Sequence, residues 1–155
     1  MGVDPTVVEE AEIAGMDANL VEYRRARAVG YTHAELVEIA GLGGNLGGYQ
    51  WARDAGATHA ELVEAAGLGV NLGGYRRARD AGATHAELVE AAGIDGGLFW
   101  YREARAAGAT HAQVVEAVTV HGLPGCLLHR FAGRMAATPD ADVATVVFEM
   151  VAGVE

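Results

Sequence analysis

The sequence predicts an all-α solenoid of about four helix–turn–helix units, each 26 residues long. Residues 55–67 and 81–93 have identical sequences, offset by one such period. Tyrosine recurs at the same interval, at Tyr23, Tyr49, Tyr75 and Tyr101. Threonine followed by histidine also recurs, beginning at Thr32, Thr58, Thr84 and Thr110. A fixed period of this length is typical of helical repeats that stack on their neighbours.

The first helix of each unit begins at a Thr-His-Ala-Glu motif. Thr32 is expected to cap the helix while Glu35 reaches back to the cap, which forms a capping box. The segment Ala34–Ala40 follows, and Gly41 is the residue type suited to a left-handed C-terminal cap. We therefore expect the first helix to end at Gly41.

The second helix of each unit is expected to begin at an asparagine cap, Asn19, Asn45 or Asn71, which Gly97 replaces in the fourth copy. In the first copy this helix is expected to end at Gly30. Helices of about 8 and 10 residues are too short to be stable alone in water. They must therefore be stabilised by packing against the helices of neighbouring units.

Helical periodicity predicts which faces are buried. On the second helix, Leu20, Tyr23 and Ala26 share one arc. On the first helix the predicted arc consists of Ala34, Val37 and Ala40, with Leu36 and Ile39 beside it. Glycine pairs in the first turn of the second helix, Gly47–Gly48 and Gly73–Gly74, cost about 1–2 kcal/mol per helix relative to alanine. They indicate either a close backbone approach or a plastic turn.

The chain is expected to form one helical-repeat domain, residues 1–155. The repeat array covers about residues 5–122, and the period fails from Pro124, so about residues 124–153 are expected to form a divergent C-terminal cap. Thr138 is expected to cap its last helix, with Pro139 in the first position. This apolar helix is expected either to cover the last repeat or to form a homodimer.

Composition narrows the class of function. The net charge of −10 disfavours strong nonspecific binding to nucleic acid and favours a soluble, acidic protein. The single cysteine, Cys126, fits a reducing compartment, and there is no apolar run long enough to span a membrane. With no basic segment before an apolar run at the N-terminus, we expect a cytoplasmic protein without membrane contact.

The residues do not indicate an enzyme. There is no serine, and Cys126 lacks a repeated His/Asp partner. The carboxylate pair Glu35 and Glu38 recurs in other units, for example as Glu61 and Glu64, whereas one active site needs one pair. The glycine-rich stretches lack the lysine and the preceding strand of a phosphate-binding loop. We therefore expect no catalytic residue and no cofactor.

No metal site is expected either. The repeated histidines, His33, His59, His85 and His111, should lie about 8–10 Å apart in a stack, whereas two zinc ligands must each lie about 2.1 Å from the metal. They are expected to be structural or solvated. His121, Cys126 and His129 fit no standard zinc spacing.

Charge is sorted between the two helices of each unit, since the second helices are rich in arginine and the first helices are acidic. One interpretation is a ladder of ion pairs in which Arg27 and its equivalents bind Glu38 and its equivalents. The alternative is a basic stripe that contacts a ligand.

Positions that differ between copies are the candidates for binding. A position maintained for folding should be the same in every copy, so variation indicates a surface that is free or adapted to a partner. On the second helices these positions are Arg24, Arg25, Gln50, Trp51, Arg76, Arg77, Phe99, Trp100 and Arg102. In the loops they are Asp17, Gly43, Gly44, Gly69, Val70, Asp95 and Gly96. The aromatic residues next to arginine would be good recognition anchors.

Two resemblances extend this interpretation. The Tyr-x-x-Ala-Arg-x-Ala-Gly-Ala-Thr-His-Ala-Glu motif resembles tandem helical repeats of uncharacterised bacterial and phage proteins, over residues 5–122. The segment Thr32–Ala40, followed by Asn45–Gln50, is similar to the repeat of TAL-effector-like DNA-binding proteins. That likeness implies that the variable loop faces bases and that Gly47, Gly48 and Gln50 approach phosphate, although the unit here is shorter.

The sequence thus favours a non-enzymatic scaffold that binds a protein or peptide, or assembles with itself. Binding of nucleic acid through the arginine stripe and loops is one alternative. Mimicry of nucleic acid by the acidic face is another. The sequence leaves the partner unidentified.

Overall fold

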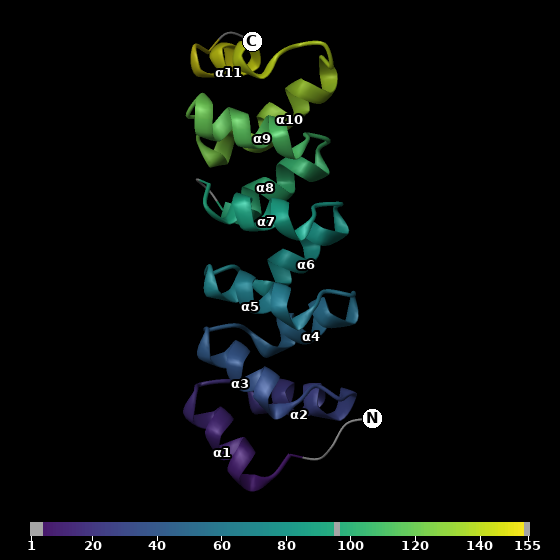
Figure 1. Ribbon diagram of the computed structural model, residues 1–155. Helices are drawn as coiled ribbons and strands as arrows, with labels where there is room; N and C mark the ends of the chain where they lie inside the picture. Colours follow the sequence, from purple (N-terminus) through teal and green to yellow (C-terminus); the bar gives the residue numbers. More distant parts are fainter. Residues whose placement is uncertain (1–4, 95–96, 154–155) are drawn as a thin grey trace. The chain divides into compact units, whose positions relative to one another are not determined.

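The computed structural model describes residues 5–94 and 97–153, and all regular structure in these residues is helical (Figure 1). The chain divides into two compact units, residues 1–76 and 77–155, and the boundary lies within helix α6 (Leu72–Asp80). The first unit contains α1 (Val7–Gly15), α2 (Leu20–Val29), α3 (His33–Gly41), α4 (Leu46–Asp54) and α5 (His59–Gly67). The second contains α7 (His85–Ala92), α8 (Gly97–Ala106), α9 (His111–Val115), α10 (Leu128–Ala137) and α11 (Val143–Val151).

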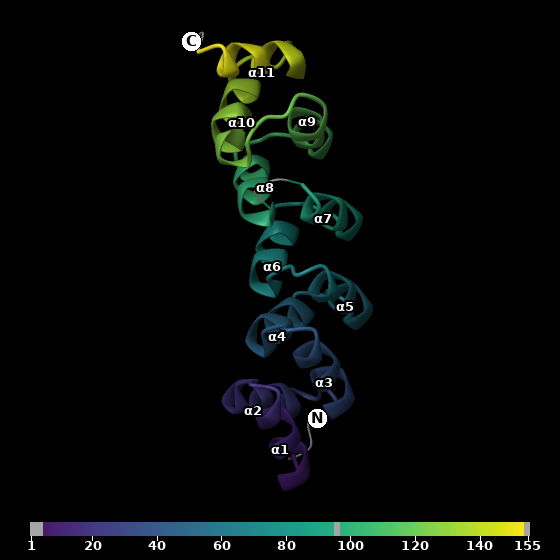
Figure 2. The ribbon, with the colours of Figure 1, turned by 90° about the vertical axis from the view of Figure 1, so that its left-hand side faces the viewer.

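Repeated helix pairs pack against one another within each unit, which confirms the predicted all-α repeat. In the first unit α3 packs against α1 and α5, while α2 packs against α4. Figure 2 shows α2 and α4 on one side of this unit, with α3 and α5 on the other. In the second unit α8 packs against both α7 and α10, and α11 covers α10. Each unit is therefore a stack of first and second helices.

The predicted caps are present. Thr32 accepts a hydrogen bond from the Glu35 backbone, and the Glu35 carboxylate accepts one from the Thr32 backbone. The same capping box begins α1, α5, α7 and α9, at Thr6, Thr58, Thr84 and Thr110. The side chains of Asn19 and Asn45 cap α2 and α4. These local signals set where each helix starts.

Both predicted helix ends are in place, since α2 is followed by Gly30 and α3 ends at Gly41, but the predicted left-handed conformation is found only at Gly30. Gly30 follows α2 with a φ of 120°, as expected. Gly41, in contrast, is the last residue of α3, and the left-handed residue is Gly43, with a φ of 77°. The equivalents of Gly43 are Gly69 (78°) and Asp17 (57°). Glycine and aspartate both tolerate this conformation, which explains why this loop position alternates between them.

On α2, Tyr23 and Ala26 are buried as predicted, while Leu20 is only half-buried. The equivalent residues of α4, Leu46, Tyr49 and Ala52, are all buried. On α3 the buried residues are Leu36 and Ile39, whereas Ala34 is exposed. The predicted alanine-centred arc was therefore wrong. The larger side chains decide the orientation, because burying them removes more apolar surface from water.

The second variable loop position is matched to a core residue of the preceding helix. A methyl group at Gly44 would lie 2.7 Å from Cγ2 of Ile39. One period later the pair is Ala65 and Val70, so the larger loop residue accompanies the smaller core residue. In the first copy Ile13 and Ala18 coexist, and the hydrogen bond from Ala18 N to Ile13 O lengthens to 3.4 Å. The equivalent bond at Gly44 is 2.9 Å, so packing accounts for this variation.

Gly48 marks a close backbone approach between α4 and α6. A methyl group on Gly48 would lie 3.0 Å from the backbone nitrogen of Gly73 and 3.3 Å from Cβ of Leu72. At Gly74, the equivalent position, the nearest atom among the described residues is 3.7 Å away and belongs to Asn71, the helix's own cap. A close approach of two backbones therefore accounts for glycine at position 48.

The C-terminal region differs from the expectation. Asp142, rather than Thr138, caps α11 and accepts a 2.7 Å hydrogen bond from the Thr145 backbone. The hydroxyl of Thr138 instead donates to the Arg134 carbonyl at the end of α10. α11 buries Val143, Val146 and Val147, which agrees with a covering role, but its Phe148 is 71% exposed.

We expect Gly44→Val to lower the free energy of unfolding by about 1–3 kcal/mol, because the new side chain collides with Ile39. Ile39→Ala alone should cost about 2–5 kcal/mol. The double variant should cost at least about 1 kcal/mol less than the sum, since Ala65 and Val70 already coexist. Urea unfolding of all four proteins measures this coupling, and additive costs would contradict the packing explanation.

Gly48→Ala should destabilise the chain by about 1–2 kcal/mol, because the contact with the Gly73 backbone outweighs the better helix propensity of alanine. Gly74→Ala is the matched control and should be neutral or stabilising by up to about 1 kcal/mol. The two midpoints of thermal unfolding report the difference. Equal shifts in both variants would argue against a close approach at Gly48.

Candidate recognition surface

A cluster of five polar side chains joins three consecutive helices. Tyr49 is fully buried on α4, and its hydroxyl lies 2.8 Å from Nδ1 of His59 on α5. Arg53 donates from Nη1 to the Tyr49 hydroxyl at 2.6 Å and to Oε2 of Glu35 at 2.8 Å. Nε2 of His59 lies 3.1 Å from the carboxylate of Glu38. The cluster thereby links α3, α4 and α5.

The distances give each donor of the cluster an acceptor. The Glu38 carboxylate can only accept, so Nε2 of His59 is the donor to it. The Tyr49 oxygen accepts from Arg53, and its hydroxyl hydrogen has two acceptors within reach, Nδ1 of His59 at 2.8 Å and Oε2 of Glu35 at 3.3 Å. Each donor in the chain has an acceptor, so the cluster is satisfied from within the protein.

The cluster recurs with the repeat. Its members are Glu9, Glu12, Tyr23, Arg27 and His33 in one copy. They are Glu87, Glu90, Tyr101, Arg105 and His111 in another. The same residue types stand at the same spacing in Glu61, Glu64, Tyr75, Arg79 and His85, which fall on both sides of the boundary between the units.

The ion pairs differ from the predicted pairing of arginine with Glu38 and its equivalents. Arg27 pairs with Glu9, and Arg53 with Glu35, so the arginine binds the capping glutamate rather than Glu38 and its equivalents. Glu38 and its equivalents bind histidine instead. The histidines His33, His59 and His111 are therefore structural members of the cluster. A structural role was one of the two predicted alternatives, the other being a solvated side chain.

The capping glutamate, the tyrosine and the arginine of the cluster are all replaced where the cluster ends. Gln113 replaces the capping glutamate of α9 and still forms the capping box with Thr110. In α10 the fourth and eighth residues are Phe131 and Met135, where α4 has Tyr49 and Arg53. Without a tyrosine hydroxyl and an arginine to bind, a carboxylate at position 113 would have no partner from those positions.

The cluster shifts the pKa values of its acidic members. Partial burial would raise the pKa of Glu35, but hydrogen bonds from Arg53 and Thr32 lower it to about 2, from an ordinary value of 4.5. Burial raises the pKa of Tyr49 to about 12, and the nearby Glu35 contributes in the same direction. Glu35 therefore stays ionised, and Tyr49 stays neutral, across the physiological range.

Trp51, a predicted anchor, lies across two second helices. It is 40% exposed, and the guanidinium of Arg76 stacks over its ring with Cζ 4.4 Å from the centroid. Arg76 also donates from Nη1 to the Trp51 carbonyl at 3.5 Å. The edge of the ring lies 3.9 Å from where a side chain at Gly73 would begin. Trp51 and Arg76 therefore form a cation–π pair that joins α4 and α6.

The other predicted residues of the first unit extend this surface along α2 and α4. Arg24 binds Glu10 of α1 through two hydrogen bonds of 2.7 and 2.9 Å. Arg25 is exposed, and Gln50 is half-buried. We call the surface formed by Arg24, Arg25, Gln50, Trp51 and Arg76 the α2–α4–α6 face.

The predicted residues of the second unit form a separate group on α8. Phe99 is 55% exposed and packs edge-on against Trp100, with ring centroids 4.8 Å apart. Arg102 lies over the Phe99 ring and binds Glu103 at 2.9 Å. Arg77 is exposed on the last turns of α6.

The predicted loop residues do not require a ligand to explain their variation. Backbone conformation accounts for Asp17, Gly43 and Gly69, and core volume for Gly44 and Val70. Asp95 and Gly96 lie outside the described residues. A binding role for the loops stays a prediction.

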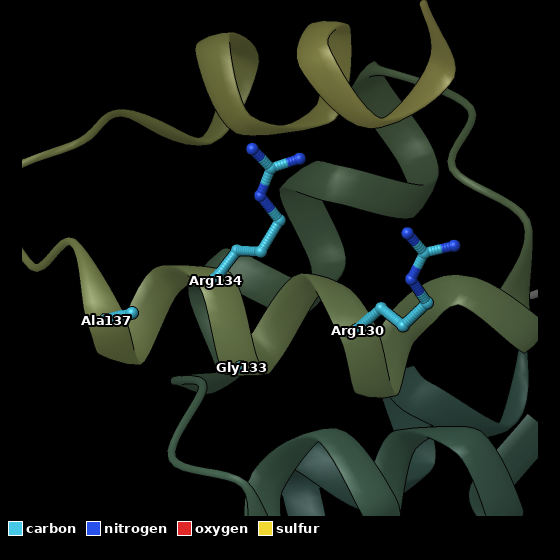
Figure 3. Close-up of a pocket in the computed structure, with 4 residues that line it drawn as sticks. All are labelled: Arg130, Gly133, Arg134 and Ala137. Carbon is cyan, nitrogen blue, oxygen red and sulfur yellow. The ribbon is translucent and has the colours of Figure 1, made fainter. Parts of the chain in front are cut away.

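A hollow beside α10 was not anticipated from the sequence. It has a volume of about 380 Å³ and is lined by Arg130, Gly133, Arg134 and Ala137 (Figure 3). Figure 3 shows both arginine side chains extending to the same side of α10. A neighbouring hollow of about 200 Å³ continues to Thr145 on α11. The Arg134 guanidinium binds Glu149 at 3.1 Å, which offsets its charge within the protein.

Within residues 5–94 and 97–153, no three histidine, cysteine, aspartate or glutamate side chains are arranged to hold a metal ion. None of the helices in that part of the chain has the length and apolar character needed to cross a membrane.

Comparison with family models, with curated proteins and with solved structures found no match to this chain. Both resemblances drawn from the repeat motif therefore stay predictions. The argument that this surface binds a partner therefore depends on its geometry alone.

We expect acid to destabilise the fold through Glu35. Because its folded pKa lies below its ordinary value, the stability it contributes is present above about pH 4.5 and is lost as the pH falls towards 2. Tyr49 acts in the opposite direction, since its raised pKa means that stability is lost as the pH rises from about 10 to 12. Urea unfolding between pH 2 and 12 measures the loss of stability at acidic pH and the loss at alkaline pH.

Glu35→Gln isolates the acidic limb, because glutamine keeps the capping box, as Gln113 does, but loses the ion pair. The variant should lose about 1–3 kcal/mol at pH 7 and depend less on pH below 4.5. Glu38→Gln is the control, because that side chain is 53% exposed and should cost less. Equal losses of unfolding free energy in the two variants would show that the ion pair between Arg53 and Glu35 contributes no more than the contact of Glu38.

Proposed function

We propose that the chain is a non-catalytic helical-repeat scaffold that binds a protein or peptide partner on the α2–α4–α6 face. One observation carries the proposal. In three copies of the cluster the repeated polar groups hydrogen-bond to one another, whereas the positions that differ between copies present arginine and tryptophan on the surface.

The composition of this face suits recognition of a polypeptide. Tryptophan and arginine are enriched among residues that dominate binding energy at protein interfaces. Trp51 is restrained by Arg76 and Gly73, so it loses less conformational freedom when a partner binds. All five residues of the face lie in one compact unit.

Nucleic-acid binding is less well supported. In that alternative the start of α4 would approach phosphate, but the Gly47 backbone N–H lies 3.2 Å from the carboxylate of Glu22 and donates to it. A phosphate at that point would meet a negative charge. The net charge of −10 acts in the same direction.

Self-assembly is the other form that the scaffold takes in this proposal. Phe148 and Val151 on α11 are both more than half exposed, next to the buried valines of the same helix. A second copy covering these residues would remove that apolar surface from water. The oligomeric state of Phe148→Ala, measured by sedimentation, separates this contribution from the α2–α4–α6 face.

We expect Trp51→Ala to lower partner affinity at least tenfold while leaving the helical content unchanged. Affinity capture with the full chain, followed by mass spectrometry and quantified binding, identifies and measures the partner. Phe148→Ala is the matched control, because it removes an exposed aromatic ring from the other unit. Unchanged affinity of the Trp51 variant would reject this anchor.

A gel shift across salt concentrations tests the alternative. Tight binding to DNA or RNA that weakens steeply with salt would replace the proposal with a nucleic-acid function. Capture of a partner that dissociates when Trp51 is removed, without such a shift, would support the scaffold.

A further inference from the structure

The cluster around Tyr49 contains one more carboxylate than it contains cations. The guanidinium of Arg53 stands against the carboxylates of Glu35 and Glu38, so one negative charge is in excess while the ring of His59 is neutral. The clusters around the tyrosines of α2 and α8 have the same composition. Each of these clusters would become electrically neutral by binding a single proton.

The ring of His59 lies between the two carboxylates of its cluster. Its Nε2 is 3.1 Å from Oε2 of Glu38, and its Nδ1 is 3.8 Å from Oε2 of Glu35. At these distances both carboxylates are within range of an ion pair with a protonated ring, whereas the guanidinium of Arg53 acts against it. On the helix of His59 itself, Glu61 accepts a hydrogen bond from the backbone of its own capping threonine.

The Tyr49 hydroxyl decides whether Nδ1 of His59 can carry a hydrogen. A neutral ring that donates from Nε2 accepts at Nδ1, and the hydroxyl oxygen is 2.8 Å away. A protonated ring has a hydrogen on both nitrogens and accepts nothing, so the hydroxyl hydrogen must then point elsewhere.

Glu35 provides the second acceptor for the hydroxyl hydrogen. Its Oε2 lies 3.3 Å from the Tyr49 oxygen. When the hydroxyl donates to Glu35, the Tyr49 oxygen can accept from Nδ1 of His59 and from Arg53, which uses both of its lone pairs. The cluster therefore has a complete set of hydrogen bonds with the ring neutral and also with the ring protonated.

The carboxylate of Glu35 is ionised where this exchange would occur. Partial burial would raise the pKa of Glu35, but hydrogen bonds from Arg53 and Thr32 lower it to about 2. Histidines ordinarily change charge between about pH 5 and 8. Glu35 is therefore available as an acceptor throughout that range.

We propose that the cluster around Tyr49 is a proton-binding site, in which His59 takes a proton from solvent at Nδ1 while Tyr49 turns its hydroxyl hydrogen from the ring to Glu35. No bond between heavy atoms forms or breaks, and the charge of every other member is unchanged. The ring, hydroxyl and carboxylates are arranged in the same way around Tyr23 and Tyr101, so the proposal extends to those clusters.

Proton binding would change the charge of the surface formed by the first helices. The side chains of Glu12, Glu38 and Glu90 are 52%, 53% and 58% exposed, and each contacts the histidine of its cluster. Each bound proton therefore cancels one negative charge close to solvent. This device goes beyond the proposed function and does not depend on it, because the α2–α4–α6 face lies on the second helices.

The test is an NMR titration of the full chain, labelled with ¹⁵N in the histidine rings and ¹³C in the tyrosine and glutamate side chains. The shifts of Nδ1 and Nε2 show which ring nitrogens carry a hydrogen. The shifts of Cζ of Tyr49 and Cδ of Glu35 follow the hydroxyl hydrogen. His129, which is exposed on α10, is the internal control for an ordinary histidine.

We expect His59 to change, as the pH falls, from a ring with a hydrogen on Nε2 alone to a ring with hydrogens on both nitrogens, while the chain stays folded. The Tyr49 and Glu35 signals should shift with the same midpoint. Glu35→Gln should weaken proton binding at His59 about tenfold, because it removes one charge and the ionised acceptor, and should leave His129 unchanged. Tyr49→Phe should reduce the coupled shift of Glu35 at least about twofold.

Unfolding of the chain before Nδ1 of His59 gains a hydrogen would overturn the proposal. Titration of His59 without a matching shift of the Tyr49 and Glu35 signals would do the same, as would equal proton binding with and without Glu35→Gln. If circular dichroism shows that a variant does not fold, the three coupled signals of the unchanged chain decide. Binding of a partner at Trp51 is measured separately, so the failure of one proposal is distinguishable from the failure of the other.

Discussion

The fold depends on placing a tyrosine hydroxyl where three helices meet. In the cluster around Tyr49, the hydroxyl is out of contact with water and must exchange hydrogen bonds with groups of the protein. A buried hydroxyl without a partner costs about 1–3 kcal/mol. The cluster meets that requirement only when the helix before, the helix carrying the tyrosine and the helix after are all in place. Helices too short to be stable alone thereby become dependent on their neighbours.

The period, the caps and the second-helix core were predictable because their signals are local. Thr32 and Glu35 are three residues apart, and Tyr49 and Ala52 share a helical face at the same separation. The partner of Arg53 was not predictable in this way. Both Glu35 and Glu38 are plausible partners by type and spacing, and the choice depends on how α3 and α4 pack. Likewise Asp142 and Thr138 are both good caps, and only the path of the chain between α10 and α11 selects one.

Variation between copies has two physical origins, which sequence alone does not separate. At Gly43 and Gly44 it follows from backbone conformation and from the volume of Ile39. Trp51 and Arg76 lie on the surface of the second helices. Other residue types stand at these positions in neighbouring copies, and the core residues of the second helices do not change with them. The candidate site was therefore only partly predictable: its aromatic and basic members were named, but the stacking that orders them depends on the approach of α4 and α6.

The way in which the cluster is shared between copies has a consequence for how such a chain changes over generations. Its members come from the end of one period and the start of the next, and two successive periods carry the same residues over 55–67 and 81–93. Recombination between those stretches removes or adds one whole period and regenerates the same junction. The gene can thus change the number of surface positions available for binding without passing through a sequence that lacks a complete set of junction residues.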